Sequence, residues 1–372
     1  MVALRGQGNW RWEGPLGTPL GLGELTPLKG TASVDANGLA TTKTLIKPDA
    51  NSNVQIVIPE GFAPVILNGS NSTTSLPGQD GSVKSIMAAD QWKNITVEQI
   101  NQGIVIVDNA ITYTGTVPNF NEYVWVSIPD EKNFTRVAWE SHIIYQEGSS
   151  NINEVTKPTL TTTPASNSFS EDNTTAEYVE MVNSVKTHKG FYIGRYEVSK
   201  NGTASQTKRG QDVWTSITNS DAITTCSNST LAPNMHLIYG IEWDSTLSWL
   251  IGKATISAES GNALMTEHDI KNDSRYWGNY HTSLGNAANA PWEGNEMLKT
   301  GASEYWKANN IYDLAGNAQE WTHEKSQTDN RGAYRDAGAT GKGNLKPVAM
   351  RDNWYAANGT SGSIGFRVSF YL

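Results

Sequence analysis

The chain has 372 residues, of which 17% are charged and 37% hydrophobic, values typical of a soluble globular protein with roughly one to three domains. Its formal net charge is −9 and its sequence pI is about 5.2, which argues against nucleic acid or an anionic membrane as the partner. Cys226 is the single cysteine, so a disulfide within the chain is excluded, and an exported protein of this kind fits a bacterium or a phage.

The first 48 residues show weak periodicity and predict an N-terminal arm or a small module. Residues 1–30 are rich in Gly, Pro and Leu and contain no apolar run long enough for a signal peptide or a membrane span. If the protein is exported, its signal is therefore expected outside this chain, or its route is unusual. Residues 49–372 are predicted to form one domain.

Three short strands are predicted in the first third of the chain, at residues 54–59, 103–108 and 122–128. Residues 68–81 predict a polar loop. Residues 146–172 are dominated by Ser, Thr, Asn and Pro, and they predict a low-complexity insertion with too little apolar surface to pack.

Two helices are predicted after the low-complexity insertion. The first is indicated by apolar residues spaced as on one helix face, which are Tyr178, Met181, Val182 and Val185. The second spans residues 236–250, with Gly252 as its stop. Strands are predicted at residues 191–198 and 364–370. With 34 Gly and 13 Trp, the pattern indicates an α+β domain with short strands, two helices and long ordered loops.

Four segments resemble the formylglycine-generating-enzyme family, a branch of the C-type lectin fold. They are residues 190–198 (Gly-Phe-Tyr-Ile-Gly-Arg-Tyr-Glu-Val), 236–250 with Glu242-Trp243-Asp244, 310–322 (Asn-Ile-Tyr-Asp-Leu-Ala-Gly-Asn-Ala-Gln-Glu-Trp-Thr) and 365–368 (Gly-Phe-Arg-Val). The four segments follow the order and spacing of the family. The resemblance implies a C-type lectin-like fold of the formylglycine-generating-enzyme type.

The resemblance also implies a structural calcium ion at the turn in residues 310–322. Family members hold it with side chains at the positions of Asp313 and Glu320 and with backbone carbonyls at Gly316 and Ala318. Calcium prefers oxygen ligands in flexible geometry, and this set supplies them. The same carboxylates can instead cap backbone groups of the turn, so both interpretations stay open. No organic cofactor is expected.

The catalytic residues of the enzymes in this family are missing from the chain. The family's oxidases use a pair of cysteines after an Arg-Gly-Gly-Ser segment, but the corresponding residues 335–347 contain none. Glycine cannot replace a thiolate nucleophile or a copper ligand. Cys226 lies far upstream and is predicted to be a small buried hydrophobe. The six histidines lack the ligand spacing that the iron-dependent sulfoxide synthases of the superfamily would need. We therefore expect no enzymatic activity; an enzyme with altered chemistry is the alternative.

The departures from the family gather in residues 333–363, a polar and aromatic stretch. Tyr, Trp, Asn and small residues on a fixed scaffold are typical of binding surfaces, although an ordinary solvated loop has a similar composition. The calcium-binding triplets of animal lectins do not occur in this chain. The predicted ligand-binding residues are Asp336, Ala337, Ala339, Lys342, Asn344, Lys346, Asp352, Asn353, Trp354, Tyr355 and Asn358.

This layout resembles the variable proteins of diversity-generating retroelements in phages and gut bacteria, in which a C-terminal segment on this fold is diversified while the scaffold stays fixed. The resemblance implies a non-catalytic ligand-binding protein that is extracellular, on a cell surface or on a phage particle. The expected partner is a protein or glycan on another cell or virus surface. Neither a nucleic-acid partner nor a membrane span in this chain is expected.

Overall fold

A seven-stranded sheet runs through the middle of the molecule and joins segments from both halves of the chain. The computed structural model describes residues 25–69, 73–139, 160–161, 169–258, 261–281, 296–327, 331–353, 355 and 359–372. In spatial order the strands of this sheet are β15 (Met235–Leu237), β24 (Val368–Phe370), β12 (Gly190–Gly194), β8 (Glu122–Ser127), β5 (Val105–Val107), β3 (Ala63–Leu67) and β4 (Val83–Ile86). All neighbouring strands are antiparallel.

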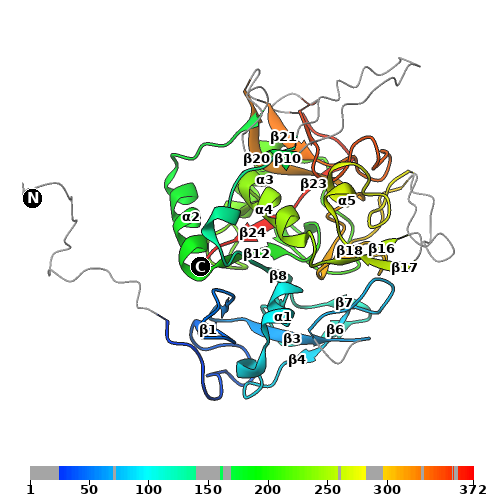
Figure 1. The fold of residues 1–372 in the computed structure, drawn as a ribbon. Helices are drawn as coiled ribbons and strands as arrows, with labels where there is room; N and C mark the ends of the chain where they lie inside the picture. The colour runs from blue at the N-terminus through cyan, green and yellow to red at the C-terminus, as the bar shows by residue number, and fades with distance from the viewer. Residues whose placement is uncertain are drawn as a thin grey trace, which may run out of the picture.

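A second, five-stranded sheet lies at the opposite side of the molecule from β3 and β4 (Figure 1). Its members are β11 (Phe169–Ser170), β20 (Gln319–Ser326), β21 (Gly332–Arg335), β22 (Arg351–Asp352) and β23 (Ile364–Phe366). β23 pairs in parallel with β20, and the chain then enters β24 of the large sheet. The C-terminal segment therefore ties the two sheets together.

The remaining strands form two-stranded pairs, and the helices are few and mostly short. The pairs are β1 (Thr44–Ile46) with β2 (Ile56–Ile58), β6 (Tyr113–Thr114) with β7 (Val117–Pro118), β9 (Ala138–Trp139) with β10 (Leu160–Thr161), β13 (Ser199–Asn201) with β14 (Ala204–Gln206), β16 (Thr255–Ala258) with β17 (Gly261–Leu264), and β18 (Lys307–Ala308) with β19 (Ile311–Tyr312). The helices are α1 (Val97–Asn101), α2 (Ala176–His188), α3 (Asn219–Ser227), α4 (Gly240–Leu250) and α5 (Glu267–Lys271), with 3-10 turns η1 (Trp92–Asn94) and η2 (Glu131–Asn133).

This mixture of helix and strand, with more sheet than helix, confirms the predicted α+β class. The expectation of two helices was incomplete, because α1, α3 and α5 also form. They span only 5, 9 and 5 residues, too short for a helical apolar period to be recognised. None of the helices in the described ranges has the length and apolar character needed to cross a membrane.

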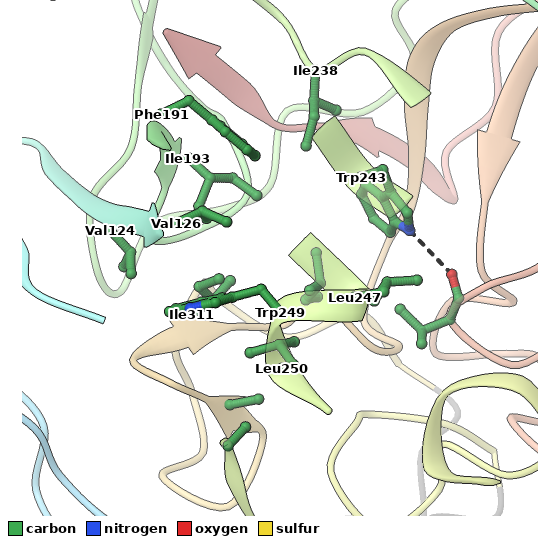
Figure 2. Close-up of a cluster of buried hydrophobic side chains, with 14 of the residues drawn as sticks. Val124, Val126, Phe191, Ile193, Ile238, Trp243, Leu247, Trp249, Leu250 and Ile311 are labelled. Atoms are coloured by element: carbon green, nitrogen blue, oxygen red, sulfur yellow. Dashed lines mark hydrogen bonds between the residues drawn. The ribbon is translucent and has the colours of Figure 1, made fainter. Parts of the chain in front are cut away.

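The main core forms where α4 packs against the large sheet (Figure 2). Trp243 and Leu247 of α4 face a cluster that includes Phe191 and Ile193 of β12. The indole Nε1 of Trp243 donates to the backbone carbonyl of Val348 at 3.3 Å, the contact drawn in Figure 2. The core helix thus holds a loop of the second sheet directly.

Several predicted elements begin or end at other residues than expected. The helix predicted at residues 236–250 starts at Gly240, because residues 235–237 instead pair with β24 as strand β15. The strand predicted at residues 364–370 is divided at Arg367, and its two halves join different sheets. Single-sequence periodicity does not show such a break, because apolar residues continue to alternate across it.

The predicted boundary after residue 48 falls inside an antiparallel pair. β1 precedes that boundary and β2 follows it, with Leu45 opposite Val57. Ala32, Ala40 and Ile46 are buried in the same cluster as Ile56 and Ile58. The described part of the N-terminal segment, from residue 25 onward, is therefore packed onto the rest of the molecule.

A buried ion pair fixes the start of α4 to the large sheet. His236 Nε2 lies 2.9 Å from Glu242 Oε2, and His236 Nδ1 lies 2.8 Å from the carbonyl of Asn234. Glu242 also accepts from the backbone N–H of Tyr239 and from the hydroxyl of Ser369. Oxygen acceptors at both ring nitrogens of His236 favour the doubly protonated imidazole.

This arrangement predicts a loss of stability as pH rises. Burial alone would lower the pKa of His236, but the Glu242 carboxylate and the Asn234 carbonyl raise it above 6.5. The protonated His236 contributes its full stabilisation below the pKa that histidine has in the unfolded chain. That stabilisation disappears as pH rises through the higher pKa of His236 in the folded protein. We expect wild type to lose more stability between about pH 6 and about pH 9 than a His236→Gln variant. Denaturant unfolding at both pH values measures this, and equal losses would contradict it.

Candidate functional site

Two arginines lie opposite each other at the two ends of residues 336–350, the loop that contains most of the predicted binding residues. β21 ends at Arg335 and β22 begins at Arg351, and the two residues are direct cross-strand partners. Like charges placed opposite each other destabilise an antiparallel pair. The loop formed by residues 336–350 therefore depends on acidic groups that neutralise this arginine pair.

Asp244 and Glu324 provide the neutralising carboxylates. Asp244 accepts from Arg335 Nη1 at 3.0 Å and from Arg351 Nη2 at 2.5 Å. Glu324 accepts from Arg335 Nε at 2.7 Å and from Arg351 Nε at 2.6 Å. Arg136 makes a third ion pair with Glu324. The network joins α4, three strands of the second sheet and the segment before the low-complexity insertion.

The network is buried and remains ionised at its centre. Burial alone would raise the pKa of Glu324, but the three guanidinium groups around it outweigh burial and hold that pKa well below its usual range. Glu171 extends the network by accepting from the backbone N–H of Gly240 at the start of α4. Burial, the largest influence, raises the pKa of Glu171 to about 8. Removing one member would leave its partners charged without compensation.

Groups outside the loop also hold the main chain of residues 336–350. The carbonyl of Gly341 accepts from the backbone N–H of His281 at 2.9 Å, and the carbonyl of Gly343 accepts from that of Ser274 at 3.1 Å. These contacts involve only backbone atoms. The side chain of Lys342, which lies between the two glycines, takes no part in them.

The glycines and their neighbours in this loop have opposite environments. A β-carbon at Gly343 would lie 2.7 Å from the ring of Tyr280, and one at Gly341 would lie 2.5 Å from another β-carbon. Lys342 and Asn344, in contrast, are exposed. The loop combines a fixed backbone with side chains that project into solvent.

Three predicted binding residues lie inside the domain. Asp336, Ala337 and Ala339 have exposed fractions of 1%, 5% and 3%. Asp336 has a φ of +73° and accepts from the Tyr280 hydroxyl at 2.5 Å and from the backbone N–H of Gly316. It joins the start of the loop to the Gly316 turn. These three residues are too deeply buried to contact a ligand at the surface. They pack under the loop and support it instead.

The other predicted binding residues are exposed, half-buried or outside the described ranges. The half-buried members are Lys346, Asp352, Asn353 and Tyr355. Lys346 Nζ donates to Asp352 Oδ2 at 2.8 Å, and the ring of Tyr355 lies 5.9 Å from that of Tyr334. Two predicted residues lie outside the described residues, namely Trp354 and Asn358.

Two of the segments that resemble the family, residues 310–322 and 365–368, meet through a buried ion pair. Glu320 Oε1 accepts from Arg367 Nη2 at 2.6 Å, and Glu320 Oε2 accepts from Arg367 Nε at 3.1 Å. Arg367 also donates to the backbone carbonyls of Gly194 and Tyr312, each at 3.0 Å. Parallel pairing of β20 with β23 places Glu320 opposite Gly365. The Glu320–Arg367 ion pair therefore holds β20 and the C-terminal strands together.

The two predicted side-chain ligands of calcium already accept hydrogen bonds within the chain. Both oxygens of Glu320 accept from a guanidinium, and Asp313 Oδ2 accepts from the backbone N–H of Gly301 at 2.7 Å. Burial, the largest influence, raises the pKa of Asp313 to about 7. Within the described ranges, no group of three or more His, Cys, Asp and Glu side chains could hold a metal ion. Calcium held by Asp313, Glu320, Gly316 and Ala318 stays a prediction.

A melting experiment tests that prediction. If calcium binds only the folded protein at this turn, wild type should melt at a higher temperature with calcium than with a chelator. Glu320→Ala should then lose most of that difference, because it removes a ligand as well as the ion pair. Equal melting of wild type in both buffers would reject the calcium site.

Cys226 is fully buried, as predicted. Burial raises the pKa of its thiol far above the usual range, so the reactive thiolate does not form near neutral pH. Burial also lowers the pKa of His323 to about 3 and that of His188 to about 4, which keeps both imidazoles neutral. His142 lies outside the described residues.

The buried charge network was missed by sequence reasoning. Its members are Arg136, Glu171, Asp244, Glu324, Arg335 and Arg351, which are spread over more than half of the chain. Charged residues are usually solvated, so their burial cannot be expected from composition. The one available signal was an arginine at each end of residues 336–350.

No protein-family model matches the chain, and no curated protein matches it. Among solved structures, it is similar to Treponema denticola variable protein 1, with 14% sequence identity and a TM-score of 0.32. The similarity covers 68% of this chain and 96% of that chain. An identity and a TM-score this low do not assign a family, so the resemblance to the formylglycine-generating-enzyme family stays a prediction.

Proposed function

We propose that this protein is a non-catalytic ligand-binding protein, with its binding surface built on the exposed side of residues 336–355. The single observation that carries the proposal is that the loop has a fixed backbone and exposed side chains. Main-chain hydrogen bonds and closely packed glycines fix its path, whereas Lys342 and Asn344 project into solvent. A backbone that is already fixed loses less conformational entropy when a ligand binds.

The same contrast between fixed backbone and exposed side chains supports a surface whose residues vary between related proteins. Side chains can be exchanged at positions 342 and 344 without disturbing the contacts that hold the loop. The buried residues around it, including Arg335, Arg351 and Glu324, would have to stay constant. This is the pattern of a C-type lectin scaffold that serves a diversity-generating retroelement in a phage or gut bacterium. A near-identical template repeat beside a reverse-transcriptase gene would support this origin, and a genome without either would reject it.

We infer that the partner is a protein or a glycan on another cell or virus surface, and that the protein acts outside the cell, on a cell surface or on a phage particle. The net charge of −9 gives no attraction to nucleic acid. The proposal of no enzymatic activity rests on the missing cysteines in residues 335–347 and on the inert, buried Cys226. An enzyme of the same fold with altered chemistry is the competing proposal.

Neighbouring positions in the loop are expected to respond oppositely to mutation. Lys342→Ala and Asn344→Ala should change the free energy of unfolding by less than about 0.5 kcal/mol, because both side chains are exposed. Gly343→Ala should cost about 1–3 kcal/mol, because its methyl group would overlap the ring of Tyr280. Denaturant unfolding of the three variants measures the contrast. Similar losses at all three positions would contradict a fixed backbone with free side chains.

A binding screen then tests the function itself. The full chain is screened against cell-surface proteins and glycans, and each partner is retested with a Lys342→Ala/Asn344→Ala double variant and with Tyr355→Ala. Loss of a central aromatic anchor should weaken binding by roughly 2 kcal/mol or more. Glu60→Ala serves as the control, because Glu60 is exposed and lies before β3. Partners that bind all variants as tightly as wild type would reject this surface as the binding site.

A further inference from the structure

The scaffold also carries an open cavity, and its lining residues lie outside the loop of residues 336–350. It has a volume of 380 Å³ and is lined by Lys200, Gln211, Asp212, Val213, Trp214 and Thr215. That volume is near the lower end of the roughly 300–1,000 Å³ typical of small-ligand sites. Four of the six lining residues are polar, which disfavours a lipid or another wholly apolar ligand.

The indole of Trp214 is positioned by the scaffold before any ligand arrives. Its backbone N–H donates to Val198 O at 2.8 Å, and its ring packs edge-on against Phe366 of β23 at 5.7 Å. The neighbouring Ser216 donates through its backbone N–H to Ser361 O at 2.9 Å. Trp214 is only half-buried, so part of the ring borders the cavity.

The face of this indole attracts groups with positive partial charge. Lys200 Nζ lies 4.9 Å from the ring centroid, the geometry of a cation–π contact. Lys200 is exposed, so its ammonium can move into water when a ligand competes for the ring. The C–H groups on one face of a pyranose ring carry positive partial charge and are attracted to the same surface.

The polar lining residues are suited to hydroxyl groups. Asp212 has a side chain that is 89% exposed, and its ion pair with Lys299, at 3.6 Å, is also exposed and therefore weak. Gln211 is held by its backbone N–H, which donates to Thr300 Oγ1 at 3.0 Å, and by its Nε2, which donates to Arg209 O at 3.2 Å. Its side-chain amide oxygen is an acceptor that suits a ligand hydroxyl.

We propose that this cavity binds a small neutral saccharide, with one face of a pyranose ring stacked on Trp214 and ring hydroxyls bonded to Asp212 and Gln211. The single ammonium and single carboxylate of the lining balance each other, so neither an anionic nor a cationic ligand is favoured. The site lies on the scaffold and is independent of the proposed binding loop. It would persist if the side chains of that loop were replaced.

Ligand-observed saturation-transfer NMR on the full chain tests the proposal with the methyl glycosides of glucose, galactose, mannose and N-acetylglucosamine. At least one glycoside should bind wild type. Asp212→Ala should weaken that binding by at least about fivefold, and Trp214→Ala should abolish it. Because Trp214 packs against Phe366, Asp212→Ala is the decisive variant: its exposed side chain puts folding at no risk.

The Lys342→Ala/Asn344→Ala double variant is the matched control and should bind the glycoside as wild type does. Its behaviour separates this site from the proposed loop surface, since either can fail without the other. The saccharide site is overturned if no glycoside binds wild type or if Asp212→Ala binds as tightly as wild type. It is also overturned if adenosine or uridine, tested alongside, binds at Trp214 and the glycosides do not.

Discussion

Replacing Glu324 with Gln is expected to lower the free energy of unfolding by about 3–5 kcal/mol, the range for breaking a buried ion pair from one side. The glutamine has nearly the same shape, so the effect isolates the charge. Arg335 and Arg351 would remain as direct cross-strand neighbours, and both would still donate to the buried carboxylate of Asp244. Arg136 would also lose its ion pair with Glu324.

The measurement is denaturant unfolding of Glu324→Gln beside Glu60→Gln, which removes an exposed carboxylate and should change little. A second substitution identifies the cause. The Glu324→Gln/Arg351→Met variant removes one positive charge together with the negative one. Its loss of unfolding free energy should therefore be smaller than the sum of the losses in Glu324→Gln and Arg351→Met measured separately. Additive losses, or a loss below about 1 kcal/mol for Glu324→Gln, would show that the network does not hold the loop.

Gly316→Ala is the second substitution with a large expected effect, a loss of about 2–5 kcal/mol in the free energy of unfolding. Gly316 has a φ of +78°, which costs a residue with a β-carbon about 1–2 kcal/mol. That β-carbon would also lie 2.5 Å from the backbone nitrogen of Asn279 and closer still to its carbonyl oxygen. Backbone atoms cannot rotate aside, so overpacking adds about 1–3 kcal/mol.

Gly202→Ala separates the two contributions. Gly202 has a φ of +63°, close to that of Gly316, but no atom lies within 4 Å of a β-carbon placed there. Its loss should be limited to the conformational part, about 1–2 kcal/mol. If both variants lost the same stability in thermal or denaturant unfolding, the close approach of Asn279 to Gly316 would not be a constraint on the fold.

Both substitutions act on the support of the proposed surface, so they also have a functional consequence. Gly316 donates through its N–H to Asp336 at the start of the loop, and Glu324 neutralises the arginine pair at its two ends. We expect variants at either position to disturb binding through the loop geometry. The exposed positions 342 and 344 should instead alter binding without altering stability.

Local sequence patterns predicted the elements that depend on short-range regularity. The period of Tyr178, Met181, Val182 and Val185 predicted α2, and alternating apolar residues predicted β8. Trp321, within the predicted segment 310–322, is buried, and its indole donates to Ile217 O at 3.0 Å. The start of α4 was predicted too early, because residues 235–237 gain more from pairing with β24 than from extending the helix.

The candidate site was predicted less well than the elements. Composition identified residues 333–363 as polar and aromatic, but it could not separate Asp336, which is buried, from Lys342, which is exposed. That difference arises from contacts with Tyr280 and Gly316, which lie 56 and 20 positions away. Burial of a polar residue is set by such distant partners and leaves no local pattern.

The sequence by itself determined the α+β class, the burial of Cys226 and the turn at Gly316, because these follow from side-chain chemistry and local backbone preference. Tertiary structure alone decided which charges became partners. Arg367 forms an ion pair with Glu320, and Glu324 forms ion pairs with Arg136, Arg335 and Arg351. An ion pair in a low-dielectric interior depends on atoms within a few ångströms of each other in space, and the spacing of charges along a chain does not encode that distance.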